Sequence, residues 1–400
     1  MKIKVFLYLL LSVLTIAVGC RAPERVVTKP SYDRPLLPGQ YALRKITNPA
    51  EIPDFTSACL DLEGLKPTIE RSLNYLSKPS SKQFFPVSGI THNQATESLK
   101  AFSDLLDSGL TGHNLDVAIK DKFDVYMSVG CDDQGTVLFT GYYTPILEGS
   151  FEPSERFRYA LYKQPDDLVK GVNGEILGQR CADGQLRQYP SRTVIENAML
   201  LKGKELVWLS DPFEAYIAHV QGSAKIRLPN GELTTVGYSA NNGHEYRNIG
   251  GIMIKEGVIS SSQLNLTTLI NYYKTHPDQV AKYTQMNPRF VFFRKEDGEP
   301  RGSLNEPVTQ MRTIATDKSI FPRGCLAFIS TALPRVEDNV VVPQSYRGFA
   351  LDQDTGGAIC APGRCDVYMG QGDTAGRLAG RTYQEGKLYY LFLKSGSSNS

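Results

Sequence analysis

The sequence predicts a mainly β protein in which one β-domain is interrupted by an inserted domain. The 400 residues include 35 Gly, 23 Pro and 21 Tyr, a composition typical of turn-rich and strand-rich chains. Strand-like alternation occurs over 123–144 and returns over 290–394, with a block of different texture, rich in helical periodicity, between them. At about 100–200 residues per domain, the length favours two domains, and a cleft between them would be the default ligand site.

Two helices and two strands are predicted for the N-terminal part. Residues 67–76 and 93–106 carry apolar side chains at helical spacing. From Phe123 the apolar positions alternate with polar ones, as in a half-buried strand. A second strand-like run covers 136–144 and ends at Pro145.

The middle block, about 150–285, mixes helices with a hairpin. Asp211 and Pro212 suit an N-cap and a first helical turn. Strand-like runs over 224–228 and 233–238 flank Pro-Asn-Gly, which predicts a hairpin. Residues 262–276 have the pattern of an amphipathic helix.

Strands dominate the C-terminal part. We expect them at 290–293, 325–330, 339–342 and 348–351, followed by a hairpin around Glu385 and Gly386. The tail, 395–400, has low complexity and predicts disorder.

Charge and composition exclude several classes of protein. The 44 Lys and Arg nearly balance the 42 Asp and Glu, whereas a dedicated nucleic-acid binder carries a clear basic excess. With 41% apolar and 22% charged residues, most of the chain should fold. There is one Trp, so an aromatic platform for a sugar would use Tyr or Phe.

The first 19 residues have the features of an export signal. Lys2 and Lys4 precede an apolar run over 5–18, which is too short to span a bilayer of about 30 Å comfortably. Small residues then lead directly to Cys20, as in a bacterial lipobox, although an ordinary secretory signal with a chance Cys is the alternative. By resemblance to bacterial lipoproteins, Arg21 after the Cys favours the outer membrane, on its periplasmic side, and 20–40 suits an extended tether.

Six cysteines remain after Cys20, and an exported chain can form disulfides. Cys360 and Cys365 are near enough in sequence to bridge a small loop. A zinc site is not expected, because no C-x-x-C pair occurs and no His stands at ligand spacing nearby.

The densest chemical signal lies over 352–372, where Asp352, Asp354 and Asp366 occur among glycines. An EF-hand is excluded because Gly363 stands where the loop needs a bidentate Glu. The glycine spacing after 370 is not that of a dinucleotide site. Capping of turns by the aspartates remains the alternative to catalysis. No G-x-S-x-G or H-E-x-x-H motif is present, and His244 lies in a polar loop.

Five segments, taken in order, resemble the membrane-bound lytic murein transglycosylase A family. The resemblance extends over residues from about 135 to 394. The last segment is also the core of the small 3D domain, about 320–394. The segments are 139–145, 220–223, 238–250, 287–293 and 354–366.

The resemblance implies a double-psi β-barrel domain, an inserted second β-rich domain and a large groove between them. We expect the barrel to use 41–149 and 286–394 and the insert to use 150–285. The family cleaves the β-1,4 bond between N-acetylmuramic acid and N-acetylglucosamine in peptidoglycan, leaving 1,6-anhydromuramoyl ends. No cofactor or metal is implied. The expected partners are glycan strands, the membrane through a lipid anchor, and proteins of the cell envelope.

The family's catalytic aspartate aligns with Asp366 and its first aspartate with Asp354. The chain departs from the family by placing Cys360 and Cys365 between them, where a disulfide would pin the loop. Candidate sugar contacts come from the matching segments: Tyr142, Tyr143, Thr144, Gln221, Ser223, Asn242 and Tyr246. For the tyrosines, plain packing within the strands is the alternative.

Our mechanistic hypothesis gives one carboxyl two roles. Asp366 would protonate the glycosidic oxygen and then accept the proton of the C6 hydroxyl as that oxygen closes onto C1, which requires a pKa above about 3.9. Asp354 would either stabilise the oxocarbenium-like charge or orient the loop. The alternatives are a non-catalytic peptidoglycan-binding lipoprotein, a structural envelope lipoprotein, and a muramidase with a second carboxylate and a seat for water.

Overall fold

The structure is a computed structural model that describes residues 30–172, 174–338 and 340–394. The expected signal segment, the acylated Cys20, the first part of the tether and the tail over 395–400 lie outside these residues. Residues 31–42, which include the end of the expected tether over 20–40, contain no helix or strand and contact the folded chain: the Tyr32 hydroxyl donates to Glu385 at 2.7 Å. In the described residues, no helix is both long enough and apolar enough to cross a membrane.

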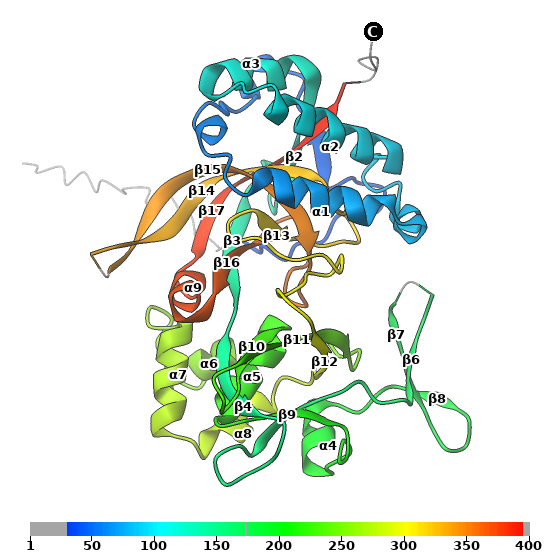
Figure 1. The fold of residues 1–400 in the computed structure, drawn as a ribbon, viewed down its shortest axis with the longest axis vertical. Coiled ribbons are helices and arrows are strands. Elements are labelled where there is room, and N and C mark those ends of the chain that lie inside the picture. The colour runs from blue at the N-terminus through cyan, green and yellow to red at the C-terminus, as the bar shows by residue number, and fades with distance from the viewer. Residues whose placement is uncertain (1–29, 173, 339, 395–400) are drawn as a thin grey trace, which may run out of the picture. The chain divides into compact units, whose positions relative to one another are not determined.

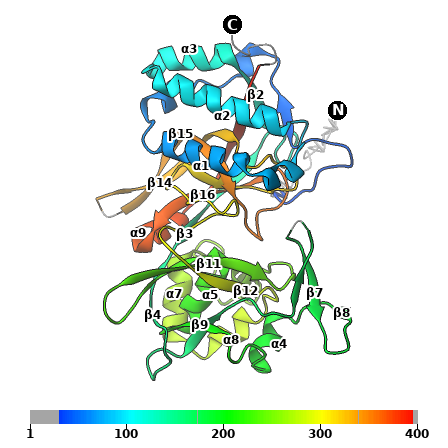
Figure 2. The ribbon, with the colours of Figure 1, turned by 45° about the vertical axis from the view of Figure 1, so that its right-hand side comes forward.

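An eight-stranded sheet combines strands from both ends of the sequence (Figures 1 and 2). Its order is β1-β2-β17-β14-β15-β13-β16-β3, and a further pairing of β17 with β3 closes six of these strands into a barrel. The strands are β1 (Leu43–Lys45), β2 (Phe123–Ser128), β3 (Val137–Thr144), β13 (Thr313–Ala315), β14 (Leu326–Glu337), β15 (Val340–Asp354), β16 (Arg364–Gln371) and β17 (Tyr383–Leu393).

Helices cover this barrel and its core is aromatic. The helices are α1 (Leu65–Ser77), α2 (His92–Asp107), α3 (Gly112–Lys122) and α9 (Gly372–Ala379). Helices α1 and α2 pack on β15 and β17, and α9 packs on β3 and β16. Phe139, Phe328, Phe349 and Phe392 are fully buried in the core. The predicted helices and the strands at the start of the chain are therefore present.

A second sheet is inserted between β3 and β13, in the lower half of Figure 1. Its order is β12-β11-β10-β4-β9-β5, and an isolated bridge between Lys163 and Phe293 joins its two edges. The strands are β4 (Ile146–Ser150), β5 (Tyr159–Tyr162), β9 (Glu205–Leu209), β10 (Ala224–Arg227), β11 (Leu233–Asn241) and β12 (Val291–Glu296). The fold class expected from the sequence is thus confirmed, with a mainly β chain and one β-rich unit inserted in another.

The insert also carries short helices and a small three-stranded arm. The predicted helix start is present, since Asp211 accepts hydrogen bonds from the backbone amides of Phe213 (2.8 Å) and Glu214 (2.9 Å). The elements are α4 (Arg192–Asn197), α5 (Pro212–Gln221), α6 (Ile249–Lys255), α7 (Leu266–Thr275), α8 (Gln279–Thr284), and the arm strands β6 (Leu168–Lys170), β7 (Ile176–Arg180) and β8 (Leu186–Arg187).

Two strand predictions differ from the structure. The separate strands at 339–342 and 348–351 are parts of the single long strand β15, which pairs with β14 along its length. The hairpin around Glu385 and Gly386 is also wrong, because β17 runs straight through both residues. Gly386 lies opposite Val137 in the pairing that closes the barrel, and a Cβ there would be 2.4 Å from the Ser330 carbonyl oxygen. The glycine therefore permits close strand packing and does not mark a turn.

Candidate active site

A groove of about 590 Å³ lies where the chain crosses between the two sheets. The barrel contributes β3, the loop after β15, and β16, whereas the insert contributes the end of α5, β11 and β12. The predicted aspartates, Asp354 and Asp366, both line it. The fold therefore brings the densest polar motif of the sequence to the groove between the barrel and the inserted sheet.

Strand alternation places Asp366 in the groove. In β16, Cys365, Val367 and Met369 point into the barrel core, so Asp366 and Tyr368 point to the other side. Asp366 is paired with Thr140 of the parallel neighbour β3, and the Thr140 hydroxyl donates a hydrogen bond to Asp366 Oδ1.

Burial raises the pKa of Asp366 to about 6. The positive charge of Arg364 lowers this pKa, and the negative charge of Asp354 raises it. Arg364 itself lies 3.3 Å from Asp33 of the expected tether. A carboxyl with a pKa near 6 is protonated in an appreciable fraction of molecules close to neutral pH, as a general acid requires.

Asp354 is anchored by backbone amides. Its Oδ1 accepts hydrogen bonds from the amides of Ser303 and Thr355, both at 2.8 Å. Burial raises the pKa of Asp354, while these amides and the nearby Tyr142 hydroxyl oppose the increase. Gly302 lets the two loops meet, because a Cβ there would be 2.8 Å from the Gln353 carbonyl oxygen. Asp354 is thus held by the amides of two loops, and its negative charge raises the pKa of Asp366.

The third aspartate of the motif does not reach the groove. Asp352 is fully buried and accepts hydrogen bonds from Thr316 and Tyr390, both at 2.7 Å, and from Lys318. Burial lowers the pKa of Lys318. This network lies under the loop that carries Asp354, and it fixes the ends of β13 and β15 to β17.

Five of the seven expected sugar contacts line the groove, namely Tyr142, Thr144, Gln221, Ser223 and Tyr246. Burial raises the pKa of Tyr246, whose hydroxyl bonds to that of Tyr216 and lies close enough to Asp366 for the two to interact electrostatically. Thr144 shares a hydrogen bond with the hydroxyl of Tyr368 at 2.9 Å.

Tyr143 and Asn242 are placed elsewhere. The Tyr143 ring is buried against Gly376 of α9, outside the lining of the groove. Asn242 donates to the carbonyls of Pro190 and Pro288 at 2.9 Å and accepts from the Phe290 amide at 2.8 Å. Its amide is saturated by backbone groups, so it orders the loop behind the groove and does not face a ligand.

Other residues in or beside the groove were not predicted from the sequence. Thr140 contacts the catalytic candidate directly, and its position was available from strand alternation, because it shares a face with Tyr142. Arg289 lies against Gly357 and donates to the His244 carbonyl at 3.1 Å. Ser303 reaches Asp354 from a loop 51 residues earlier in the chain.

The expected disulfide between Cys360 and Cys365 is not formed. Both are free thiols; Cys365 is buried in the barrel core and Cys360 is exposed on the preceding loop. Alternation along β16 turns Cys365 inward, away from that loop. No group of three or more His, Cys, Asp or Glu side chains in the described part of the chain could hold a metal ion.

Two family models match the chain. The MltA specific insert domain matches residues 138–294, and the 3D domain matches residues 312–392. The first match spans the inserted sheet and the second covers the barrel strands that carry Asp354 and Asp366.

Named relatives and solved structures agree with these matches. Membrane-bound lytic murein transglycosylase A of Escherichia coli K12 is 27% identical over 90% of this chain and 91% of that protein. The homolog from Buchnera aphidicola is 30% identical over 65% of this chain and 68% of its own length.

The crystal structure of a membrane-bound lytic murein transglycosylase from Agrobacterium tumefaciens has a TM-score of 0.73 at 24% identity, covering 88% of this chain and 98% of that one. That of E. coli MltA with bound chitohexaose has a TM-score of 0.67 at 24% identity, covering 91% and 99%. The chain belongs to the membrane-bound lytic murein transglycosylase A family.

Proposed function

We propose that this protein is a lytic transglycosylase that cleaves the β-1,4 bond between N-acetylmuramic acid and N-acetylglucosamine in peptidoglycan and leaves 1,6-anhydromuramoyl ends. The observation that carries the proposal is Asp366, a carboxyl in the wall of the groove whose pKa burial raises to about 6. The named relatives are murein transglycosylases, and a neighbouring fold is described with bound chitohexaose, which supports a glycan strand as the ligand of this groove.

The reaction needs one acid that later becomes a base. Protonated Asp366 donates its proton to the glycosidic oxygen, the bond from C1 to that oxygen breaks, and positive charge develops at C1. The C6 hydroxyl of the same muramyl residue then attacks C1 and gives its proton to the Asp366 carboxylate. The enzyme returns to its starting state, and no water enters the product.

The neighbours of Asp366 fit this cycle. The Thr140 hydroxyl donates to Oδ1 and so fixes the rotation of the carboxyl, leaving the other oxygen to carry the proton. Asp354 contributes negative charge that would stabilise the positive charge developing at C1, in addition to its bonds within the loop. Tyr142 on the barrel wall and Tyr246 on the insert wall offer ring faces to the sugars.

For location, we propose a lipoprotein of the outer membrane on its periplasmic side, anchored through Cys20. The relatives named membrane-bound support membrane association. Incorporation of labelled palmitate into the wild-type chain, and its loss in Cys20→Ala, would test the anchor.

The reaction is tested by its products. Purified murein sacculi are incubated with the protein, the released muropeptides are separated, and their masses are determined by mass spectrometry. Anhydromuramoyl ends, absent with Asp366→Asn, are expected. Reducing ends that contain an added water would instead identify a hydrolase, and intact glycan with bound protein would identify a non-catalytic binder.

A further inference from the structure

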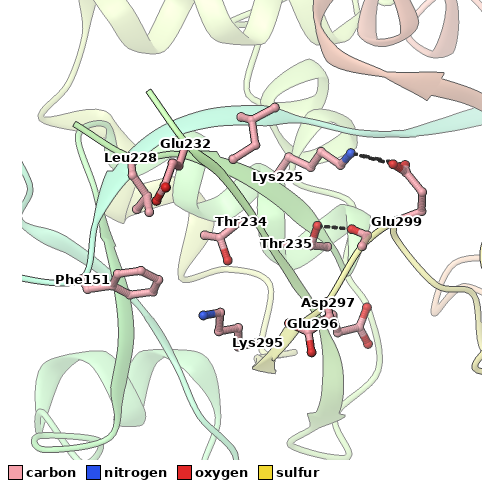
Figure 3. Close-up of a pocket in the computed structure, with 12 residues that line it drawn as sticks. Phe151, Lys225, Leu228, Glu232, Thr234, Thr235, Lys295, Glu296, Asp297 and Glu299 are labelled. Carbon is pink, nitrogen blue, oxygen red and sulfur yellow. Dashed lines mark hydrogen bonds and ion pairs between the residues drawn. The ribbon is translucent and has the colours of Figure 1, made fainter. Parts of the chain in front are cut away.

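A second cavity of about 560 Å³ opens at the ends of the strands of the inserted sheet (Figure 3). Phe151 follows β4, Leu228 follows β10, and Lys295 lies near the end of β12. The cavity therefore combines an aromatic and aliphatic wall with charged groups of both signs. None of the chemistry assigned to the catalytic groove uses it.

Some of its charges are already engaged and others are not. Lys225 pairs with Glu299 at 3.1 Å, and Glu299 also accepts a hydrogen bond from Gln371 of the barrel, so these groups join the two units. By contrast, Lys295 forms no ion pair within the described ranges, and its ammonium lies 5.5 Å from the centre of the Phe151 ring. Figure 3 shows the Lys295 side chain extending into the cavity toward that ring. Lys295 is therefore free to meet a carboxylate from outside.

Glu296 belongs to the lining of both cavities. It is only 9% exposed; its Oε1 accepts from Arg294 Nε at 3.0 Å and Nη2 at 2.8 Å. Its Oε2 is buried and has no hydrogen-bond partner among the described residues. Gly237 makes room for this carboxylate, because a Cβ there would be 2.3 Å from Oε2. A buried carboxylate oxygen without a donor is costly, which points to a donor that arrives with a ligand.

We propose that this second cavity binds the peptide stem of the muramyl residue whose glycan strand occupies the catalytic groove. The proposal rests on the proposed function, because it is the murein strand that carries the peptide past Glu296. Lys295 and Glu296 are consecutive in β12 and point to opposite faces of the strand. A stem peptide leaving the groove would offer amide and ammonium donors to Glu296 on the groove face. Past the edge of the strand it would offer carboxylates to Lys295 and small aliphatic side chains to Phe151. Removing the peptide leaves only the lactyl carboxylate on the muramyl residue and takes away the ammonium group, the further carboxylates and the aliphatic side chains of the stem.

The proposal predicts that the enzyme prefers peptide-bearing murein over peptide-free strands, and that this preference depends on the second cavity. We would measure kcat/KM with the full-length protein on peptide-bearing murein and on the same strands after an amidase has removed the peptides. The ratio of the two values should fall about fivefold in Lys295→Glu, the size expected for an exposed charge contact. It should also fall in Glu296→Gln, which keeps the volume but removes the negative charge. Lys202→Glu, an exposed control beyond both cavities, should leave the ratio at its wild-type value.

Binding gives a second measurement. Calorimetric titration with the peptides released by the same amidase should show saturable binding to the wild type and weaker binding to Lys295→Glu. An unchanged ratio in both variants, with wild-type production of anhydro ends from both substrates, overturns the peptide site alone. Absence of anhydro ends with the wild type on either substrate would instead overturn the proposed reaction.

Discussion

On the barrel wall of the groove, Asp366 is a carboxyl with one side-chain donor, whereas on the insert wall Asn287, Tyr216 and Tyr246 form a connected network of an amide and two phenols. Asp366 receives a hydrogen bond from Thr140, and burial raises its pKa to about 6. Across the groove, Asn287 donates to the Tyr216 hydroxyl at 3.1 Å and accepts from the amides of Arg247 and Arg289 at 3.0 and 3.2 Å. Tyr216 in turn bonds to Tyr246.

This contrast separates reaction from recognition. A carboxyl that is buried with too few donors keeps its proton to a higher pH, and this is what a general acid needs. A phenol or amide whose other bonds are satisfied within the protein presents one fixed face to a ligand, which favours binding over proton transfer. Changes on the barrel wall should therefore affect turnover, and changes on the insert wall should affect affinity.

The largest effect should come from Asp366→Asn. An amide cannot deliver the proton, so kcat should fall at least about a thousandfold, within the range given by loss of a general acid. Affinity for chitohexaose, measured by calorimetry, should stay within about twofold of the wild type, because the insert wall is intact. A variant that turned over murein at a near-normal rate would remove Asp366 from the mechanism.

The same substitution should stabilise the fold. The pKa of Asp366 is raised on folding, so its charge costs stability above about pH 6 and costs nothing below the unfolded value near 3.9. Asp366→Asn should therefore increase the free energy of unfolding at pH 7.5 by about 1–3 kcal/mol and leave it nearly unchanged at pH 3.5. Chemical denaturation at the two pH values measures this, and an equal gain at both would show that charge burial is not its cause.

On the insert wall, Tyr246→Phe removes only a hydroxyl. The ring keeps its place, while the bond to Tyr216 and any bond to the sugar are lost. We expect KM for murein to increase about fivefold with kcat little changed, the effect of losing about one hydrogen bond. A fall in kcat with constant KM would instead give Tyr246 a role in the chemical step and would erase the division between the walls.

Local sequence patterns predicted most helices and strands, because the apolar periodicity and the caps of each element depend on residues near it in the sequence. The alternation from Phe123 and the cap at Asp211 both depend on neighbours in sequence, and the structure shows both elements. Gly386 misled because a glycine in a turn and a glycine in a crowded strand are identical in sequence. Its environment comes from Ser330 and Val137, which are distant along the chain.

The residues of the site were predicted less completely than the fold. The alternation of side chains along β3 explains some of the errors. Adjacent strand residues point to opposite faces, so Tyr142 and Tyr143 could not both face the groove, and Thr140 had to share the face of Tyr142. No local sequence pattern predicts the contact between Ser303 and Asp354, because the two residues are 51 positions apart and meet only in the folded chain. Nothing in the sequence singles out Glu296 either, since it is notable for a buried carboxylate oxygen without a hydrogen-bond partner among the described residues and belongs to no motif.

The smallest effect we predict concerns two charges on the barrel wall that act on Asp366 in opposite directions. Arg364 lowers the pKa of Asp366 and Asp354 raises it. Activity should decline as pH increases through the pKa of Asp366, near 6 in the wild type, because the acid form is lost. Arg364→Gln should move this decline to higher pH, and Asp354→Asn should move it to lower pH, each by about half a pH unit. Profiles of kcat/KM on peptide-free strands measure both shifts. If Asp354→Asn reduced the rate without moving the decline, Asp354 would act through its bonds to Ser303 and Thr355 and not through its charge. The pKa of Asp366 would then be set by burial, which raises it, and by Arg364, which lowers it.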